Sequence, residues 1–145
     1  MKPNTKNAIL ILSPLIFVFI FLAKTYFHWS ELPAVIILRF DSIGMNIGSQ
    51  SISQFIITTI MLQSFLGLLT SFGVWFTIYH KKNIFPTNVA MSIGNFLIGL
   101  ITGISLFLIE KNAKLADANL ISAAILSFGG IFYSLILCDK FEEKN

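Results

Sequence analysis

Long apolar segments dominate the chain and alternate with shorter polar ones. A helix that crosses the hydrocarbon core of a bilayer needs about 20 mainly apolar residues. Lipid offers the backbone no hydrogen-bond partner, so such a segment must satisfy its own peptide groups as a helix. We therefore predict an all-α integral membrane protein that forms a single membrane domain over residues 1–145. Its four transmembrane helices are expected at residues 8–27, 54–79, 89–109 and 118–137.

The first apolar segment contains Pro14, which lacks an N–H group and is expected to kink the helix or to mark its first turns. Lys24 lies near the other end, where its ammonium group is expected to reach the lipid headgroups. Basic residues followed by an apolar run are also typical of a signal peptide. Because no Ala-x-Ala pattern ends this run, we expect a retained helix.

The segment between the first two predicted helices, residues 28–53, is too long for a simple connector, and long loops are usually functional or separately structured. Pro33 disfavours helix at Leu32, and the β-branched and aromatic residues of Ala34 to Phe40 favour a short strand. Asp41 to Gly44 is a turn signal. We predict a structured outer loop, a small extended or hairpin element on the outer face of the bundle.

Polar side chains of this loop allow more specific expectations. Ser51 or Ser53 is placed to cap the second helix. Arg39 and Asp41 carry opposite charges, and Glu31 lies nearby in the sequence. One interpretation is a local ion pair that holds the turn. The other is a recognition surface for an extracellular peptide.

Composition and charge support the membrane interpretation. Apolar residues make up 55% of the chain and charged residues 12%, whereas a soluble domain carries about 25% charged residues. This balance excludes a water-soluble globule, a disordered tail and a nucleic-acid-binding domain, and it makes membrane lipid a partner. Cytoplasmic loops of membrane proteins are enriched in basic residues. We expect a multi-pass protein of the cell membrane with both termini in the cytoplasm, because this places more basic residues inside (Lys2, Lys6, Lys81, Lys82, Lys140, Lys144) than outside (Lys24, Arg39, Lys111, Lys114).

The central parts of the predicted spans contain no Asp, Glu or His. Proton-coupled transport, intramembrane hydrolysis and metal binding normally require such residues. The two histidines, His28 and His80, fall at opposite membrane faces in the predicted topology. A single cysteine, Cys138, excludes an internal disulfide. We therefore expect no enzyme activity, no cofactor and no metal.

The polar residues that do fall inside the spans include Gln63 and Asn95. The favoured interpretation is a hydrogen bond between helices, and the alternative is a contact with a bound peptide or substrate. Small residues also recur at helical spacing, in the Gly99-x-x-x-Gly103 motif and in two further stripes (Ala123, Ser127, Gly130, Ser134 and Ser64, Gly67, Ser71). We expect these stripes to pack the bundle against itself. A homo-oligomer formed through Gly99 and Gly103 is the alternative.

The outer loop also carries a motif, Leu32-Pro33-x-x-Ile36-x-x-Arg39-Phe40-Asp41-x-x-Gly44, followed by Gly48-Ser49. It resembles the short N-terminal signature of the SdpI-type bacterial membrane proteins, which reads LPxxIPxHFxxxG, then an acidic residue, then GSK, directly after a first spanning helix. The resemblance covers about residues 9 to 65. Ile37 stands where the family has its second proline, Arg39 where it has a histidine, and Gln50 where it has a lysine.

The resemblance implies immunity or signalling. Members of the family are associated with protecting a Gram-positive cell from a secreted, membrane-active peptide toxin, and some with holding a small cytoplasmic regulator at the membrane. Carried over to this chain, the loop containing Lys81 and Lys82 would be the inward face. The outward, partner-binding sensor would be formed by Leu32, Pro33, Arg39, Phe40, Asp41 and Gly44.

Three functions follow as hypotheses. The leading one is a small, non-catalytic immunity or sensing protein that binds an extracellular membrane-active peptide through the outer loop, and it predicts that Arg39 and Asp41 are essential. The second is a small-solute transporter or transporter subunit, which predicts sensitivity at Gln63 and Asn95. The third is an accessory scaffold of a larger membrane complex, which would copurify with a fixed partner.

Overall fold

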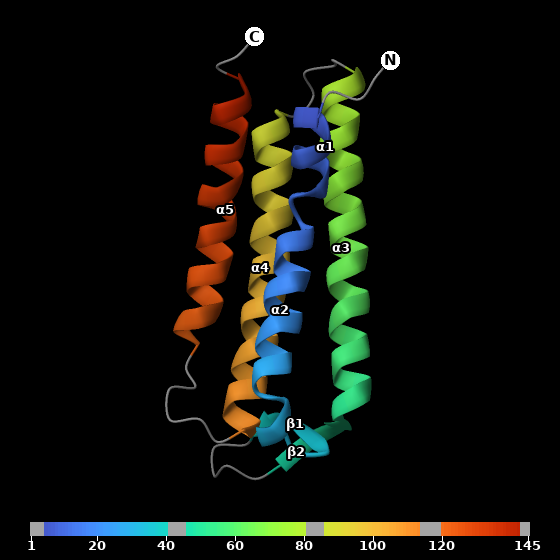
Figure 1. The fold of residues 1–145 in the computed structure, drawn as a ribbon, viewed down its shortest axis with the longest axis vertical. Coiled ribbons are helices and arrows are strands. Elements are labelled where there is room, and N and C mark those ends of the chain that lie inside the picture. Colours follow the sequence, from blue (N-terminus) through green and yellow to red (C-terminus); the bar gives the residue numbers. More distant parts are fainter. Residues whose placement is uncertain (1–4, 41–45, 81–85, 114–119, 143–145) are drawn as a thin grey trace.

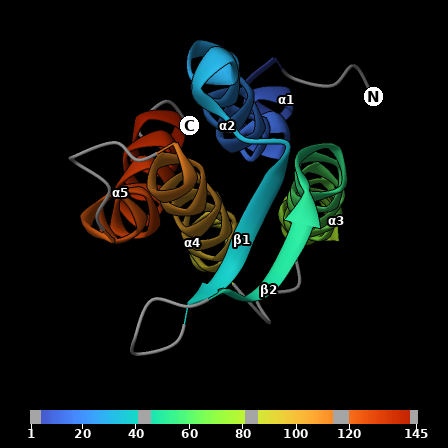
Figure 2. The same ribbon diagram turned by 90° about the horizontal axis from the view of Figure 1, so that it is seen from below.

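The computed structural model describes residues 5–40, 46–80, 86–113 and 120–142. The structure is a bundle of helices with a small β-hairpin across one end (Figure 1). Figure 2, seen from below that end, shows the hairpin lying over the helices. The helices are α1 (Thr5–Leu12), α2 (Leu15–Phe27), α3 (Ile52–His80), α4 (Thr87–Asn112) and α5 (Ile121–Glu142), and a 3₁₀ turn, η1 (Trp29–Glu31), follows α2.

Three described helices, α3, α4 and α5, are long and apolar enough to cross a membrane. They correspond to the second, third and fourth predicted spans, and each extends a few residues beyond at least one of its predicted bounds. α1 begins and α5 ends at the same end of the bundle, opposite the hairpin (Figure 1). Large apolar side chains such as Phe19, Leu68 and Phe132 point outward, whereas Gln63 and Asn95 are buried. An apolar exterior around a polar interior indicates a membrane location.

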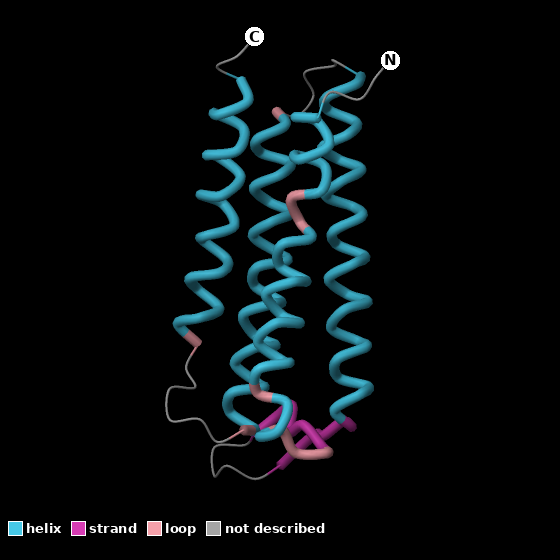
Figure 3. Tube along the Cα trace, in the orientation of Figure 1, coloured by secondary structure: helices cyan, strands magenta, loops and turns pink. Residues whose placement is uncertain are grey.

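The first predicted span is two helices rather than one, because the chain breaks between α1 and α2 at Ser13 and Pro14 (Figure 3). Pro14 has no N–H group to donate, so regular helix bonding stops at this point. The Ile11 carbonyl instead accepts a hydrogen bond from Ser71 Oγ of α3 at 2.6 Å. The expected disturbance at Pro14 is confirmed. It divides the segment into α1 and α2, of which α2 is a short apolar helix.

α4 is the most buried of the three long helices, since 44% of its most apolar 18-residue stretch is buried inside the protein. It packs against α5, α3 and α2. Gly99 and Gly103 allow the closest of these contacts. A Cβ at Gly99 would collide with the Leu126 carbonyl of α5, and one at Gly103 would collide with Ala123. The expectation that the small stripes pack the bundle against itself is confirmed here, and α5 already covers the two glycines that a second copy would need.

Gln63 and Asn95 join neighbouring helices, as the favoured interpretation predicted. Gln63 Nε2 donates to Thr102 Oγ1 at 2.8 Å, which links α3 to α4. Asn95 Nδ2 donates to Ser134 Oγ at 2.9 Å, which links α4 to α5. Bonds of this kind are worth about 0.6–2 kcal/mol each within a membrane.

The contact between α4 and α5 gives a direct stability test. We expect Gly103→Ala to lower the stability by about 1–3 kcal/mol, because the added methyl group meets the Ala123 backbone, which cannot swing away as a flexible side chain can. The midpoint of thermal unfolding in detergent, followed by circular dichroism, measures the effect. Gly129→Ala on α5 is the matched control, since nothing lies within 4 Å of its added Cβ. Equal losses in both variants would contradict close α4–α5 packing at Gly103.

Candidate functional site

The segment between α2 and α3, the predicted outer loop, contains an antiparallel hairpin of β1 (Val35–Phe40) and β2 (Asn46–Ser51). The predicted strand and hairpin are thereby confirmed, with β1 starting one residue later than expected. Pairing continues to the start of α3, where the Ile52 N–H donates to the Ala34 carbonyl at 3.0 Å. The Gln54 N–H donates to Ser51 Oγ at 3.3 Å, so Ser51 is the predicted helix cap. The hairpin is thus continuous with α3.

Ile36 anchors the hairpin to the bundle. Its side chain is fully buried, and it belongs to one apolar core cluster with residues of α2, α3 and α4 (Phe21, Phe55, Leu106, Ile109). Leu32 and Leu38 pack against the same cluster and are partly buried. Fully burying a side chain of this size is worth about 1.5–3 kcal/mol. The hairpin therefore shares the core of the bundle at this end.

Asn112, the last residue of α4, holds β1 by its backbone. Its Oδ1 accepts the Ile37 N–H at 2.7 Å, and its Nδ2 donates to the Ile37 carbonyl at 3.0 Å. Nδ2 also donates to the Leu108 carbonyl of α4 at 2.8 Å. One side-chain amide thus replaces a neighbouring strand at Ile37. This fixes β1 to α4 and closes the edge of the hairpin at this point.

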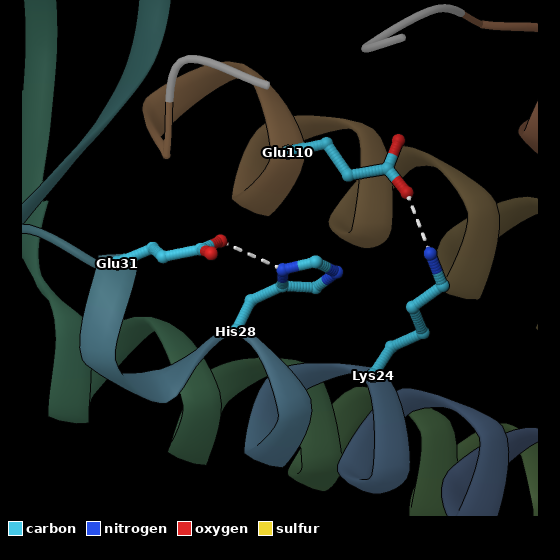
Figure 4. Close-up of polar contacts among 4 residues, drawn as sticks. All are labelled: Lys24, His28, Glu31 and Glu110. Carbon is cyan, nitrogen blue, oxygen red and sulfur yellow. Dashed lines mark hydrogen bonds and ion pairs between the residues drawn. The ribbon is translucent and has the colours of Figure 1, made fainter. Parts of the chain in front are cut away.

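An ion pair and a hydrogen-bonded pair lie at the same end (Figure 4). Lys24 Nζ of α2 lies 3.2 Å from Glu110 Oε1 of α4, and the Glu110 side chain is only 14% exposed. His28 Nδ1 lies 2.9 Å from Glu31 Oε2 across the turn that follows α2. The first pair joins two helices and the second pair orders the entry to the hairpin. Among the described residues, no group of three or more His, Cys, Asp or Glu side chains could hold a metal ion.

The structure places the residues predicted to bind a partner as follows. Leu32 and Pro33 lie between η1 and β1 and are partly buried. Arg39 and Phe40 end β1, opposite Gly48 and Asn46 of β2. The register shifts on both sides of Arg39, which marks an irregularity in the strand there. The remaining two, Asp41 and Gly44, lie outside the described residues, so an ion pair between Arg39 and Asp41 stays a prediction.

Sequence reasoning missed Asn112 and the partner of Lys24. The third predicted span ends at residue 109, which leaves Glu110 in the polar connector that follows. The structure instead places Glu110 within α4, where it pairs with Lys24. Lys24 therefore binds a carboxylate as well as lying near a helix end. A signal was present, because Lys24 and Glu110 lie near the ends of two predicted spans on the same side of the membrane and carry opposite charges.

Asn112 generates a prediction about the dynamics of the hairpin. In Asn112→Ala the Ile37 N–H and carbonyl lose their side-chain partner. Loss of such bonds costs about 1–3 kcal/mol, so we expect amide exchange in β1 to accelerate by about tenfold or more. Hydrogen–deuterium exchange with mass spectrometry reports this directly. Asn88→Ala at the opposite end of α4 is the control, and unchanged exchange in β1 of Asn112→Ala would show that this amide does not hold the hairpin.

The Lys24–Glu110 pair generates a second prediction. A double-mutant cycle with Lys24→Met and Glu110→Gln is expected to give a coupling energy of up to about 1 kcal/mol, because the Lys24 side chain is 48% exposed and solvent screens the pair. Lys24→Met alone should cost more than the double variant, since it leaves a poorly exposed carboxylate unpaired. Unfolding midpoints supply the four energies. The cycle of Lys24→Met with Glu31→Gln should give no coupling, and equal coupling in both cycles would argue against a specific pair.

Comparison with known proteins does not place the chain in a family: no family model, no curated protein and no solved structure matches it. The resemblance to the SdpI-type proteins therefore stays a prediction that rests on the motif residues of the outer loop.

Proposed function

We propose that this chain is a small, non-catalytic, multi-pass protein of the cell membrane that recognises an extracellular membrane-active peptide and acts in immunity or sensing. The observation that carries the proposal is the docked hairpin. Ile36 and Asn112 fix it to the bundle, so its remaining surface is preorganised to meet a partner. The resemblance of the same residues to the SdpI-type signature supports the kind of partner.

The proposal includes four spans, with α1 and α2 together acting as the first. Residues 5–27 extend roughly 30 Å or more at about 1.5 Å per residue, which is the thickness of the hydrocarbon core. Ser71 satisfies the Ile11 carbonyl at the break, as a backbone group within a bilayer requires. An even number of spans agrees with α1 beginning and α5 ending at the same end of the bundle (Figure 1). We place that end in the cytoplasm because of the basic excess in the sequence.

Recognition would use the outer edge of β2. In a two-stranded sheet each strand has one unpaired edge, and Asn112 occupies that of β1 at Ile37. Ile37 directs its N–H and carbonyl away from β2, so its partner Ser49 directs its own groups away from β1. An extended peptide can add to such an edge as a third strand. Arg39 and Phe40 would lie at the far end of the strand pair and would supply specificity.

A survival assay tests this function. The chain is expressed in a sensitive Gram-positive host and challenged with culture supernatant from the native organism, at matched membrane abundance of each variant. We expect the wild type to protect, and Arg39→Ala and Ser49→Pro to lose protection. Proline at position 49 removes the N–H that would pair with the peptide but no bond of the β1–β2 ladder.

Ser49→Ala is the matched control, because it keeps the N–H group and should protect as the wild type does. Protection by Ser49→Pro equal to that by Ser49→Ala would refute strand addition at β2. Equal killing of cells with and without the wild-type chain would count against immunity. The transporter hypothesis would then lead, since a cavity lies beside Gln63, and it predicts loss of uptake or export on substitution of Gln63 and Asn95.

A further inference from the structure

A cavity of about 420 Å³ lies where the α1–α2 segment faces α3. Pro14 and Gly67 both line it, and a Cβ at Gly67 would lie 3.7 Å from Pro14 Cβ, in ordinary van der Waals contact. Apolar residues, including Leu15 and Leu68, form most of its walls. Both leucines are about half exposed or more on the outside of the bundle, so the cavity opens toward lipid. Its size suits a small molecule rather than a whole phospholipid.

Gln63 lines this cavity and carries a buried, unsatisfied polar atom. The residue is 1% exposed, and its Oε1 has no hydrogen-bond partner among the described residues. Thr102 cannot satisfy it, because the Thr102 hydroxyl donates its proton to the Ile98 carbonyl at 2.7 Å and so only accepts from Gln63 Nε2. A buried acceptor left without a donor costs about 1–3 kcal/mol. One residue of the cavity lining thus carries an acceptor that a ligand could satisfy.

Ser64 also lines the cavity, whereas the hydroxyl of Ser71 is already bonded to the Ile11 carbonyl. Two lining residues therefore supply an acceptor, Gln63 Oε1, and a hydroxyl group, that of Ser64. A ligand hydroxyl matches both, because it donates one hydrogen bond and accepts others. No charged side chain is among the described residues that line the cavity, so a charged ligand would be desolvated without compensation.

We propose that this cavity is a binding site for a small, uncharged, lipophilic alcohol that enters from the bilayer and donates its hydroxyl proton to Gln63 Oε1. The site lies on the α1–α2 and α3 helices, away from the hairpin, and it does not depend on peptide recognition there. Its occupant would rest its hydrocarbon part on Leu15 and Leu68 and its hydroxyl between Gln63 and Ser64.

Photolabelling of the full chain in nanodiscs of phosphatidylethanolamine and phosphatidylglycerol tests the site. Two probes are compared, an alkyl diazirine with a terminal hydroxyl and the same diazirine with a terminal methyl, and peptide mass spectrometry locates the label. In the wild type we expect the hydroxyl probe to label the α1–α3 cavity about fivefold more than the methyl probe, which corresponds to a net hydrogen bond of about 1 kcal/mol. Unlabelled n-decanol should compete for the labelling.

Two variants separate the contribution of the hydrogen bond from that of the cavity volume. Gln63→Leu should bring the two probes to equal labelling, and it leaves Thr102 bonded to the Ile98 carbonyl. Gly67→Leu should fill the cavity and abolish labelling by both probes, whereas Gly73→Leu on the same helix should not, since nothing lies within 4 Å of a Cβ there. Circular dichroism and size-exclusion chromatography verify that each variant is folded.

Equal labelling of the wild type by the two probes would overturn the proposal and leave a groove for hydrocarbon chains. A hydroxyl preference that persists in Gln63→Leu would overturn the assigned acceptor. The comparison of the two probes on the wild type decides the question even where a variant does not fold.

Discussion

The structure depends on the rule that a peptide group within a bilayer must find its hydrogen-bond partner inside the protein. Long helices meet this rule by themselves, but the chain departs from regular helix at two places that matter. At Pro14 the freed Ile11 carbonyl is taken by Ser71, and at the hairpin the outward groups of Ile37 are taken by Asn112. At each place one polar side chain from a helix distant in the sequence bonds backbone groups that the regular elements leave unpaired.

The same rule shapes the interior. Several buried hydroxyl groups donate to the carbonyl one turn earlier in their own helix, as Thr25, Ser127 and Ser134 do. Such residues add little volume and leave no unsatisfied donor, so helices can approach closely where lipid provides no hydrophobic force between them. Gly99 and Gly103 extend this to direct contact between backbones, which explains why α4 is the most buried of the long helices. Small polar side chains inside and large apolar side chains outside are the arrangement that a surrounding lipid bilayer favours.

The local features of this fold could be predicted from the sequence. Span length, the disturbance at Pro14, the strand before Asp41 and the Ser51 cap all depend on residues that are neighbours in the chain. The contacts that fix the candidate site could not, because Asn112 is 75 residues from Ile37 and Glu110 is 86 residues from Lys24. The third predicted span therefore ends before Glu110, although the carboxylate of this residue lies between helices. Pairing across such separations depends on the orientation of each helix about its own axis, which the hydropathy of the sequence does not specify.

The side-chain amides of Gln63 and Asn95 show how the bonding of neighbouring hydroxyl groups affects ligand binding. Gln63 donates to Thr102, and Asn95 donates to Ser134, but each hydroxyl has already given its proton to a carbonyl of its own helix. Neither hydroxyl can therefore donate to the amide, and both amide oxygens remain without a partner among the described residues. Asn95 is completely enclosed, so its unpaired oxygen reduces the net stabilisation that the bond between α4 and α5 provides. Gln63 has the same chemistry beside an open cavity, and only there can an outside donor remove the cost.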